Sequence, residues 1–195
     1  DGTGAKTGLG FQPDMVWVKA RGATNDHKLT DAVRGVEEAL TPSTTAVETT
    51  YDQGLLAFGA DGFTVGTDDH FDSTTGSGMV AWSWEGGGAA STNTNGDIDT
   101  EVSVNTTAGF SIITYTGDGV TGQTIGHGLS QAPDMTISFD RDGGNPWVWT
   151  KSMNDGYNTY IQLDGTWSGT NPSSGYFTAA SATTLTMTTG TSFLN

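Results

Sequence analysis

The chain has 195 residues and no cysteine, and 22 acidic residues against 7 basic residues give it a formal net charge of −15 at pH 7. The lack of cysteine excludes disulfides, thiolate metal sites and cysteine nucleophiles. The negative charge makes nucleic acid and anionic membranes poor partners, because both carry charge of the same sign. No run of 18 apolar residues occurs, so the sequence predicts no membrane-spanning helix.

The first 40 residues predict one strand and one ambiguous segment. Residues 15–19 alternate in polarity, and Pro13 ahead of them suits the start of a strand. One face of this strand carries Met15, Trp17 and Lys19, and the opposite face carries Val16 and Val18. Residues 29–40 alone have helical character, and they fit a short helix or a strand followed by a turn equally well.

The rest of the first half predicts a hairpin and a tryptophan-bearing strand. Residues 55–58 and 63–65 flank the turn pair Asp61-Gly62, which is typical of a tight hairpin. Residues 79–84 alternate so that Val80, Trp82 and Trp84 share one face. A buried tryptophan removes on the order of 200 Å² from water, so we expect this strand to anchor the core of the first half.

Residues 86–96 are rich in Gly, Ser and Asn and contain no large apolar side chain, which predicts a linker. Beyond them, alternating apolar runs predict further short strands. These strands are expected at residues 98–104, 110–115, 147–149, 160–163, 185–187 and 193–194.

Two stretches of the chain resemble each other. Pro13-Asp14-Met15 reappears as Pro133-Asp134-Met135, and the same offset brings Arg21 onto Arg141. We interpret this as an internal duplication. The predicted fold is all-β, with two tandem antiparallel β-sandwiches of lectin-like or jelly-roll-like type: residues 1–85, the linker 86–96, and residues 97–195. The first repeat lacks its first strands and the second its last strand, so we expect flanking sequence or neighbouring subunits to supply them.

One acidic loop is a candidate cation site. Asp68, Asp69 and Asp72 lie within five positions together with His70. Calcium binds six to eight oxygen ligands in proteins, and this loop could give three of them. The alternative is that these carboxylates only solubilise the loop. No other cofactor is expected.

A second acidic stretch and the three histidines are weaker candidates for a metal or catalytic site. The carboxylates of Asp97, Asp99 and Glu101 are spaced like the first half of a calcium loop, but Val102 stands where such a loop needs glycine. Alternation instead predicts a solvated strand face. The three histidines are scattered, and we interpret each as a solvated loop side chain; they are His27, His70 and His127.

Aromatic residues of the second half predict a candidate glycan-binding platform made of Trp147, Tyr157 and Trp167, with Trp149 beside Trp147. The alternative is that Trp147 and Trp149, which share a strand face, pack into the core. No Gly-x-Ser-x-Gly and no His-Glu-x-x-His motif occurs. With 22 acidic residues, a carboxylate pair suited to glycoside hydrolysis would arise by chance. We therefore expect no enzymatic activity.

Several motifs together resemble a known family. They are G-F-x-P-D-M-V-W-V-K, D-A-V-R-G, F-G-A-D-G-F-T-V-G and A-W-S-W in the first half, and A-G-F-S-I-I-T-Y-T-G-D-G and I-G-H-G-L-S-Q-A-P-D-M in the second. This set is similar to an uncharacterised repeat domain of tail-fibre and virion structural proteins from tailed bacteriophages of marine and cyanobacterial type. The second half departs from it at residues 137–141, where an apolar-Lys-x-Arg stretch is usual.

The resemblance implies a non-enzymatic structural protein of a tailed-phage virion, assembled in the host cytoplasm, and a host-facing tail-fibre or appendage module above all. It implies a homo-oligomer whose partners are other copies of itself and other virion proteins. Two alternatives stay open: a decoration protein on the capsid surface, and a lectin-like carbohydrate-binding module that contacts a host surface glycan. No catalytic residues follow from the resemblance.

Overall fold

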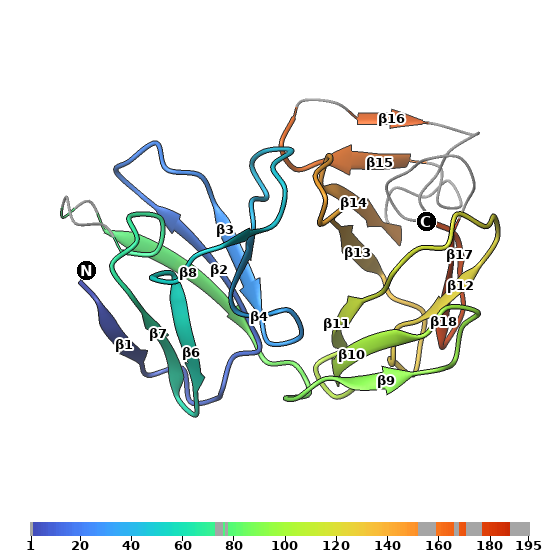
Figure 1. Cartoon of the computed structure of the whole chain (residues 1–195). Coiled ribbons are helices and arrows are strands. Elements are labelled where there is room, and N and C mark those ends of the chain that lie inside the picture. Colours follow the sequence, from blue (N-terminus) through green and yellow to red (C-terminus); the bar gives the residue numbers. More distant parts are fainter. Residues whose placement is uncertain are drawn as a thin grey trace.

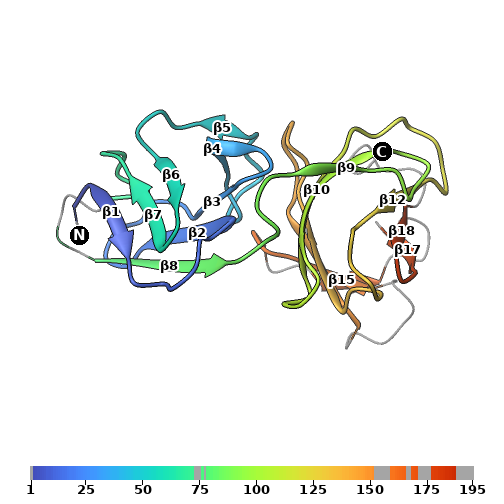
Figure 2. The same ribbon diagram turned by 90° about the horizontal axis from the view of Figure 1, so that it is seen from below.

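A computed structural model describes residues 2–72, 76, 78–151, 159–165, 168–170 and 177–187. The fold is all-β: the strands pair in small antiparallel sheets, and the described residues contain no α-helix. The two halves of the chain lie side by side, with residues before and after about position 88 on opposite sides of the junction (Figures 1 and 2). No helix in the described ranges is long and apolar enough to cross a membrane.

The first half contains two sheets. One has the order β5-β4-β3-β2-β8 and the other the order β1-β7-β6. The strands of the larger sheet are β2 (Met15–Ala20), β3 (Lys28–Asp31), β4 (Gly35–Leu40), β5 (Thr49–Thr50) and β8 (Met79–Trp84). Those of the smaller sheet are β1 (Gly4–Thr7), β6 (Leu55–Gly59) and β7 (Gly62–Val65).

Both sheets contribute to one apolar core. Val16 and Val18 of β2 are buried against Leu55, Phe63 and Val65 of the smaller sheet. The outer residues of β2 alternate with them at intermediate exposure, as the sequence predicted. The β6–β7 hairpin turns at Ala60-Asp61, one residue before the predicted Asp61-Gly62 pair, because Gly62 already begins β7 and pairs with Gly59.

The ambiguous segment 29–40 forms two strands joined by a turn, not a helix. Asp31 ends β3, and its Oδ1 accepts the backbone N–H groups of Val33 and Arg34, both at 3.0 Å. An aspartate that caps its own turn in this way offers the backbone an alternative to helical hydrogen bonds. The chain therefore reverses at this point and pairs β4 with β3.

The prediction that residues 79–84 anchor the first core is wrong for its tryptophans. The register pairs Trp17 with Trp82 and Met15 with Trp84, so both β8 tryptophans lie on the outer face of the sheet. Trp82 remains 45% exposed. Trp84 stacks on Phe110 of the second half, with ring centroids 6.3 Å apart. Trp84 therefore serves the junction between the halves, whereas Trp82 packs edge to face on Trp17.

The second half contains three sheets, with the orders β13-β14-β15-β16, β12-β18-β17 and β11-β10-β9. The first consists of β13 (Met135–Ser138), β14 (Trp147–Thr150), β15 (Thr159–Gln162) and β16 (Ser168–Thr170). The second consists of β12 (Thr124–Gly126), β17 (Phe177–Ala180) and β18 (Thr184–Met187). The third consists of β9 (Ser91–Asn93), β10 (Thr100–Asn105) and β11 (Phe110–Thr114).

The strands expected in the second half are present wherever the structure describes them; the one expected at 193–194 lies outside the described residues. Their core joins the first two sheets through Ile125, Trp147, Tyr160, Phe177 and Leu185, together with Met187.

The sheets of the two halves correspond in order and in irregularity. The orders β5-β4-β3-β2 and β16-β15-β14-β13 match, and so do β1-β7-β6 and β12-β18-β17. The β6–β7 register shifts between Leu55 and Ala57, and the β17–β18 register shifts between Phe177 and Ala179. Two differences remain within the described ranges. No strand lies beside β13 as β8 lies beside β2, and the first half has no counterpart of the sheet β11-β10-β9.

Residues 86–96, predicted as a linker, are fastened to both halves. The Oδ2 of buried Asp14 accepts the N–H groups of Gly86 and Gly88 at 2.9 and 3.1 Å. The N–H of Gly87 donates to Oγ of Ser103 at 2.9 Å. A Cβ atom on Gly87 would lie 2.3 Å from the carbonyl oxygen of Val104, so the backbones approach as closely as glycine permits. The segment then continues into β9.

Candidate functional site

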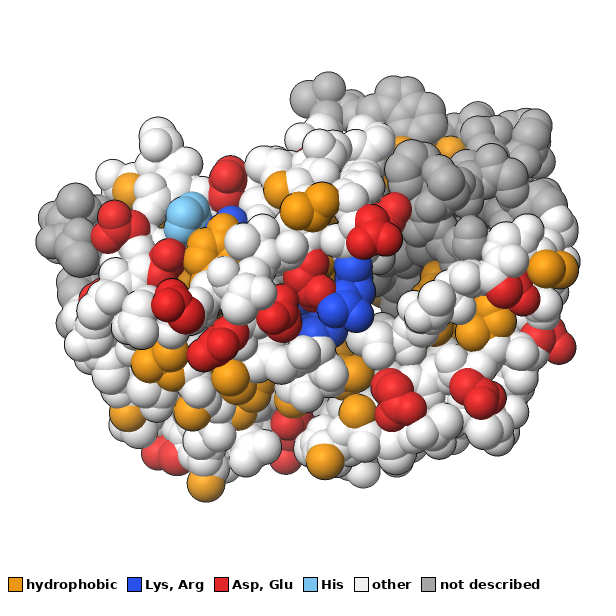
Figure 3. Space-filling model, in the orientation of Figure 1, with side chains coloured by type: hydrophobic (Ala, Val, Ile, Leu, Met, Phe, Trp, Pro, Cys, Tyr) orange, Lys and Arg blue, Asp and Glu red, His pale blue; other side chains and the backbone are white. Residues whose placement is uncertain are grey.

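A groove of about 1270 Å³ lies between the two halves. Its first wall is the outer face of the β5-β4-β3-β2-β8 sheet, including Met15, Trp17 and Trp84. The second wall is formed by residues 109–117 and 129–142, which contain β11 and β13. Charged side chains of both signs gather at this junction, as Figure 3 shows. Because this groove is a wide concavity lined by both apolar and charged side chains, we take it as the candidate site.

A network of four charged side chains crosses the groove. Nε of Arg34 contacts Oδ2 of Asp31 at 2.6 Å, and Nη1 of Arg34 contacts Oε1 of Glu48 at 2.6 Å. The other oxygen of Glu48 accepts from Nε of Arg141 at 2.6 Å. We call these four residues the clasp. It joins the two halves, because Arg141 follows β13 whereas the other three members belong to the first half.

Burial differs sharply within the clasp. The side chains of Arg34, Asp31 and Glu48 are 3%, 4% and 9% exposed, whereas that of Arg141 is 54% exposed. Arg34 also donates to the carbonyl oxygen of Leu29 at 3.0 Å. A backbone hydrogen bond from Glu48 N–H to the carbonyl oxygen of Arg141, at 2.8 Å, reinforces the join. The three first-half members of the clasp are therefore desolvated, whereas the side chain of Arg141 is partly solvated.

The clasp controls the titration of Glu48. Burial is the largest influence and raises the pKa of this carboxyl group, but hydrogen bonds and charge from Arg34 and Arg141 together outweigh it and hold the pKa below its usual range. Glu48 is thus ionised at neutral pH. Because the carboxylates and guanidinium groups of the clasp satisfy one another, this set offers no free acid or base for catalysis.

A tyrosine also faces the groove. The hydroxyl of Tyr115 is buried and has no hydrogen-bond partner among the described residues. Burial and the nearby Asp140 both raise the pKa of Tyr115. It therefore stays a neutral phenol.

Two of the three histidines lie in environments that the sequence did not predict. His127 is 1% exposed, and its Nδ1 accepts the N–H of Leu129 at 3.1 Å, so the prediction of a solvated side chain is wrong here. Burial lowers the pKa of His127, against a smaller opposing effect of the Ser181 carbonyl. His27 accepts the indole N–H of Trp17 at 2.9 Å. Burial and then Lys19 lower the pKa of His27.

The three aspartates of the acidic loop lie in different environments. Asp72 is 4% exposed, and its Oδ1 accepts the N–H of Gly2 at 2.7 Å. Oδ1 of Asp68 accepts the N–H of His70 at 2.9 Å, while Asp69 is exposed. Among the described residues, no three His, Cys, Asp or Glu side chains come close enough together to hold a metal ion.

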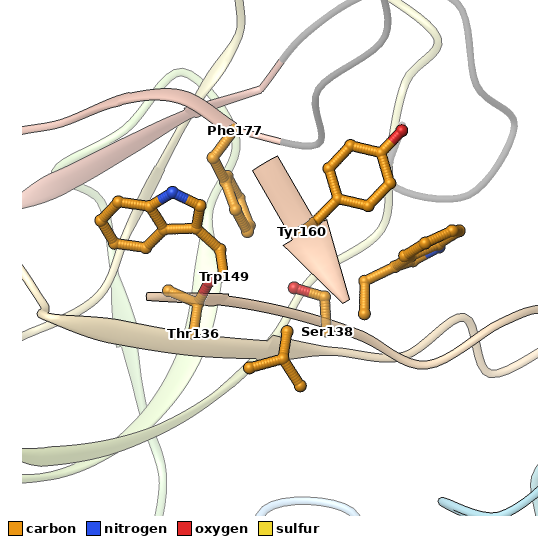
Figure 4. Close-up of a pocket in the computed structure, with 7 residues that line it drawn as sticks. Thr136, Ser138, Trp149, Tyr160 and Phe177 are labelled. Carbon is orange, nitrogen blue, oxygen red and sulfur yellow. The ribbon is translucent and has the colours of Figure 1, made fainter. Parts of the chain in front are cut away.

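Of the predicted glycan platform, only Trp147 lies within the described residues; Tyr157 and Trp167 lie outside them. Trp147 is 8% exposed and meets Tyr160 edge to face, with ring centroids 4.7 Å apart. It borders a void of about 10 Å³ together with Phe177 (Figure 4). Such a void holds one water molecule at most, so this face of Trp147 is core.

Sequence reasoning missed the clasp. The offset between the two similar stretches brought out Arg141, but nothing in its surroundings indicated a partner, and Glu48 lies 93 positions away in a Ser/Thr-rich loop. Arg34 stood in the D-A-V-R-G motif without an assigned role. The signal that could have found it is the small number of basic residues, 7 in the whole chain. Arg34 and Arg141 both lie in the stretches singled out above, and a buried arginine needs a carboxylate partner.

Comparison with known proteins places the chain in a family. A family model described as a domain of unknown function, DUF7483, matches residues 1–195. The chain belongs to this family. No curated protein and no solved structure shows significant similarity to the chain. Family membership therefore brings no activity with it, and the function must be argued from the geometry.

Proposed function

We propose that this DUF7483 chain is a non-enzymatic structural module of a tailed-phage virion, belonging to a host-facing tail fibre or similar appendage. The observation that carries the proposal is the junction: two β units of the same strand order are held together by buried contacts and not by a free tether. Such a module suits an extended assembly that must keep its shape. The resemblance of the sequence motifs to virion repeat domains supports the same proposal.

We further infer that the two halves are copies of one β-sandwich unit. The matching strand orders and the matching register shifts support this inference. So does the Pro-Asp motif, since the carbonyl oxygen of Asp14 accepts the N–H of Ala32 and that of Asp134 accepts the N–H of Lys151, both at 2.8 Å. Each motif therefore starts a strand and closes the same type of hairpin. A core shared between two sheets in each half supports the sandwich description.

The non-enzymatic part of the proposal rests on the clasp. Catalytic acids and bases need a free proton site within reach of a substrate. The carboxylates of Asp31 and Glu48 instead accept hydrogen bonds from Arg34 and Arg141. Carbohydrate binding by the predicted platform gains no support either, because the described face of Trp147 is enclosed by core residues.

Immunogold electron microscopy of purified particles tests the proposal. Antibody raised against the folded chain should label the tail appendages at regular positions, and pre-immune serum gives the background. Label confined to the capsid surface would replace the fibre role with that of a decoration protein. Particles without label, from a lysate in which the protein is present, would refute a virion role.

A further inference from the structure

The outer edge of β13 has no strand partner among the described residues. β13 pairs on one side with β14, and β2 by comparison pairs on both sides, with β3 and β8. The groove runs along this edge: every residue from 129 to 142 lines it, and so does every residue from 109 to 117. A strand that showed only one face to a cavity would contribute alternate residues. Consecutive residues indicate that the backbone edge itself is open.

The two Pro-Asp motifs show what the missing strand changes. The N–H of Asp14 donates to the carbonyl oxygen of Trp84 at 2.8 Å, and its carboxylate is buried beneath the glycines that follow β8. The side chain of Asp134 is 75% exposed, and its Oδ1 pairs with Nζ of Lys151 at 3.2 Å. Met15 is half-buried opposite Trp84, whereas Met135 is 52% exposed. The greater exposure of Asp134 and Met135 is what we expect where no strand covers β13 as β8 covers β2.

We propose that the β13 edge binds an antiparallel strand of the β8 type, supplied by another copy of this unit. The inference rests on the duplicated unit proposed above and not on the virion role. Copying the β2–β8 register onto β13 sets Met135 opposite the residue equivalent to Trp84 and Ile137 opposite the equivalent of Trp82. The two glycines after the strand would then reach the carboxylate of Asp134, as Gly86 and Gly88 reach Asp14.

The walls of the groove match such an occupant in polarity and charge. Trp17 and Phe110 supply apolar surface. Five carboxylates against two guanidinium groups line the groove, so an anionic segment is disfavoured there. Residues 79–84 are uncharged and carry apolar side chains on both faces. Strand addition of this kind obtains affinity from main-chain hydrogen bonds and specificity from alternate side chains.

Another copy docked in this way would make a head-to-tail contact, because the donating strand and the accepting edge lie on different halves of the chain. Contacts of that kind build open filaments or rings. An unpaired edge in the free chain is also a site where association begins.

A fluorescein-labelled peptide covering residues 78–88 tests the proposal on the intact chain. We expect a saturable rise in anisotropy, a melting temperature that increases with peptide concentration, and slower amide exchange at residues 135–138 but not in β2. The control peptide carries proline in place of Val80 and Trp82, which removes two strand donors, and should bind at least about tenfold more weakly.

Because the control changes only the peptide, loss of binding cannot come from misfolding of the protein. Absence of saturable binding, equal binding of the proline peptide, or protection confined to segments other than β13 would each overturn the proposal. Failure of particle labelling with intact peptide binding would refute the virion role alone.

Discussion

Glu48→Gln is the sharpest test of the clasp. The substitution keeps the shape of the side chain but removes the charge between Arg34, which is 3% exposed, and Arg141. Breaking a buried pair by removing one partner costs roughly 3–5 kcal/mol, because a desolvated charge is left behind. The glutamine oxygen retains one acceptor and Asp31 still pairs with Arg34, so we expect the lower end, about 3 kcal/mol. For a chain of this size that corresponds to a fall of about 6–12 °C in Tm.

Arg141→Gln is the matched control. Its side chain is 54% exposed, and exposed ion pairs contribute only about 0–1 kcal/mol. Urea unfolding followed by tryptophan fluorescence measures both variants, since six tryptophans report on the two halves. We predict a large loss in the free energy of unfolding for Glu48→Gln and a small one for Arg141→Gln. Equal losses in the two variants, or a loss below about 1 kcal/mol for Glu48→Gln, would refute it.

Three further predictions concern the junction and the buried histidine. Asp14→Ala should lower the free energy of unfolding by about 2 kcal/mol or more, because two glycine N–H groups lose their buried acceptor. Asp134→Ala should lower it by less than about 0.5 kcal/mol, because that side chain is exposed. Equal losses in urea unfolding would contradict this prediction. Gly87→Ala should cost about 1–3 kcal/mol by clash with the backbone of Val104, and an unchanged Tm would show that the segment yields freely. Burial lowers the pKa of His127 in the folded state below its unfolded pKa of 6.5, so the folded protein favours the neutral imidazole. The stability gained from the neutral imidazole is complete above pH 6.5 and is lost as the pH falls through the folded-state pKa. His127→Gln should therefore lose less stability than the parent between pH 7.5 and pH 5, and parallel pH profiles would contradict the assignment.

Local patterns predicted much of the fold. The alternation in residues 15–19 gave both the strand and the buried Val16 and Val18, because a pleated strand places successive side chains on opposite faces. The Asp-Gly signal predicted the β6–β7 turn to within one residue: the turn lies at Ala60-Asp61, and Gly62, which has a positive φ, begins β7. These features depend on neighbours within a few residues, which sequence reasoning can follow.

The misplaced features depend on contacts between distant segments. Alternation showed that Trp82 and Trp84 share a face but not which face points into the core, because that depends on the pairing of β8 with β2, more than 60 positions earlier. The glycine-rich residues after β8 read as a tether since their partner, Asp14, lies 72 positions earlier. Burial of His127 likewise depends on its contact with Ser181, 54 positions later.

Quantitative mass spectrometry of washed particles, against an isotope-labelled standard of this chain, tests the central claim of a virion building unit most directly. We predict a fixed copy number per particle that survives repeated density-gradient purification and is lost together with the tail proteins in mutants that lack tails. A chain found in the lysate but lost from purified particles would contradict it.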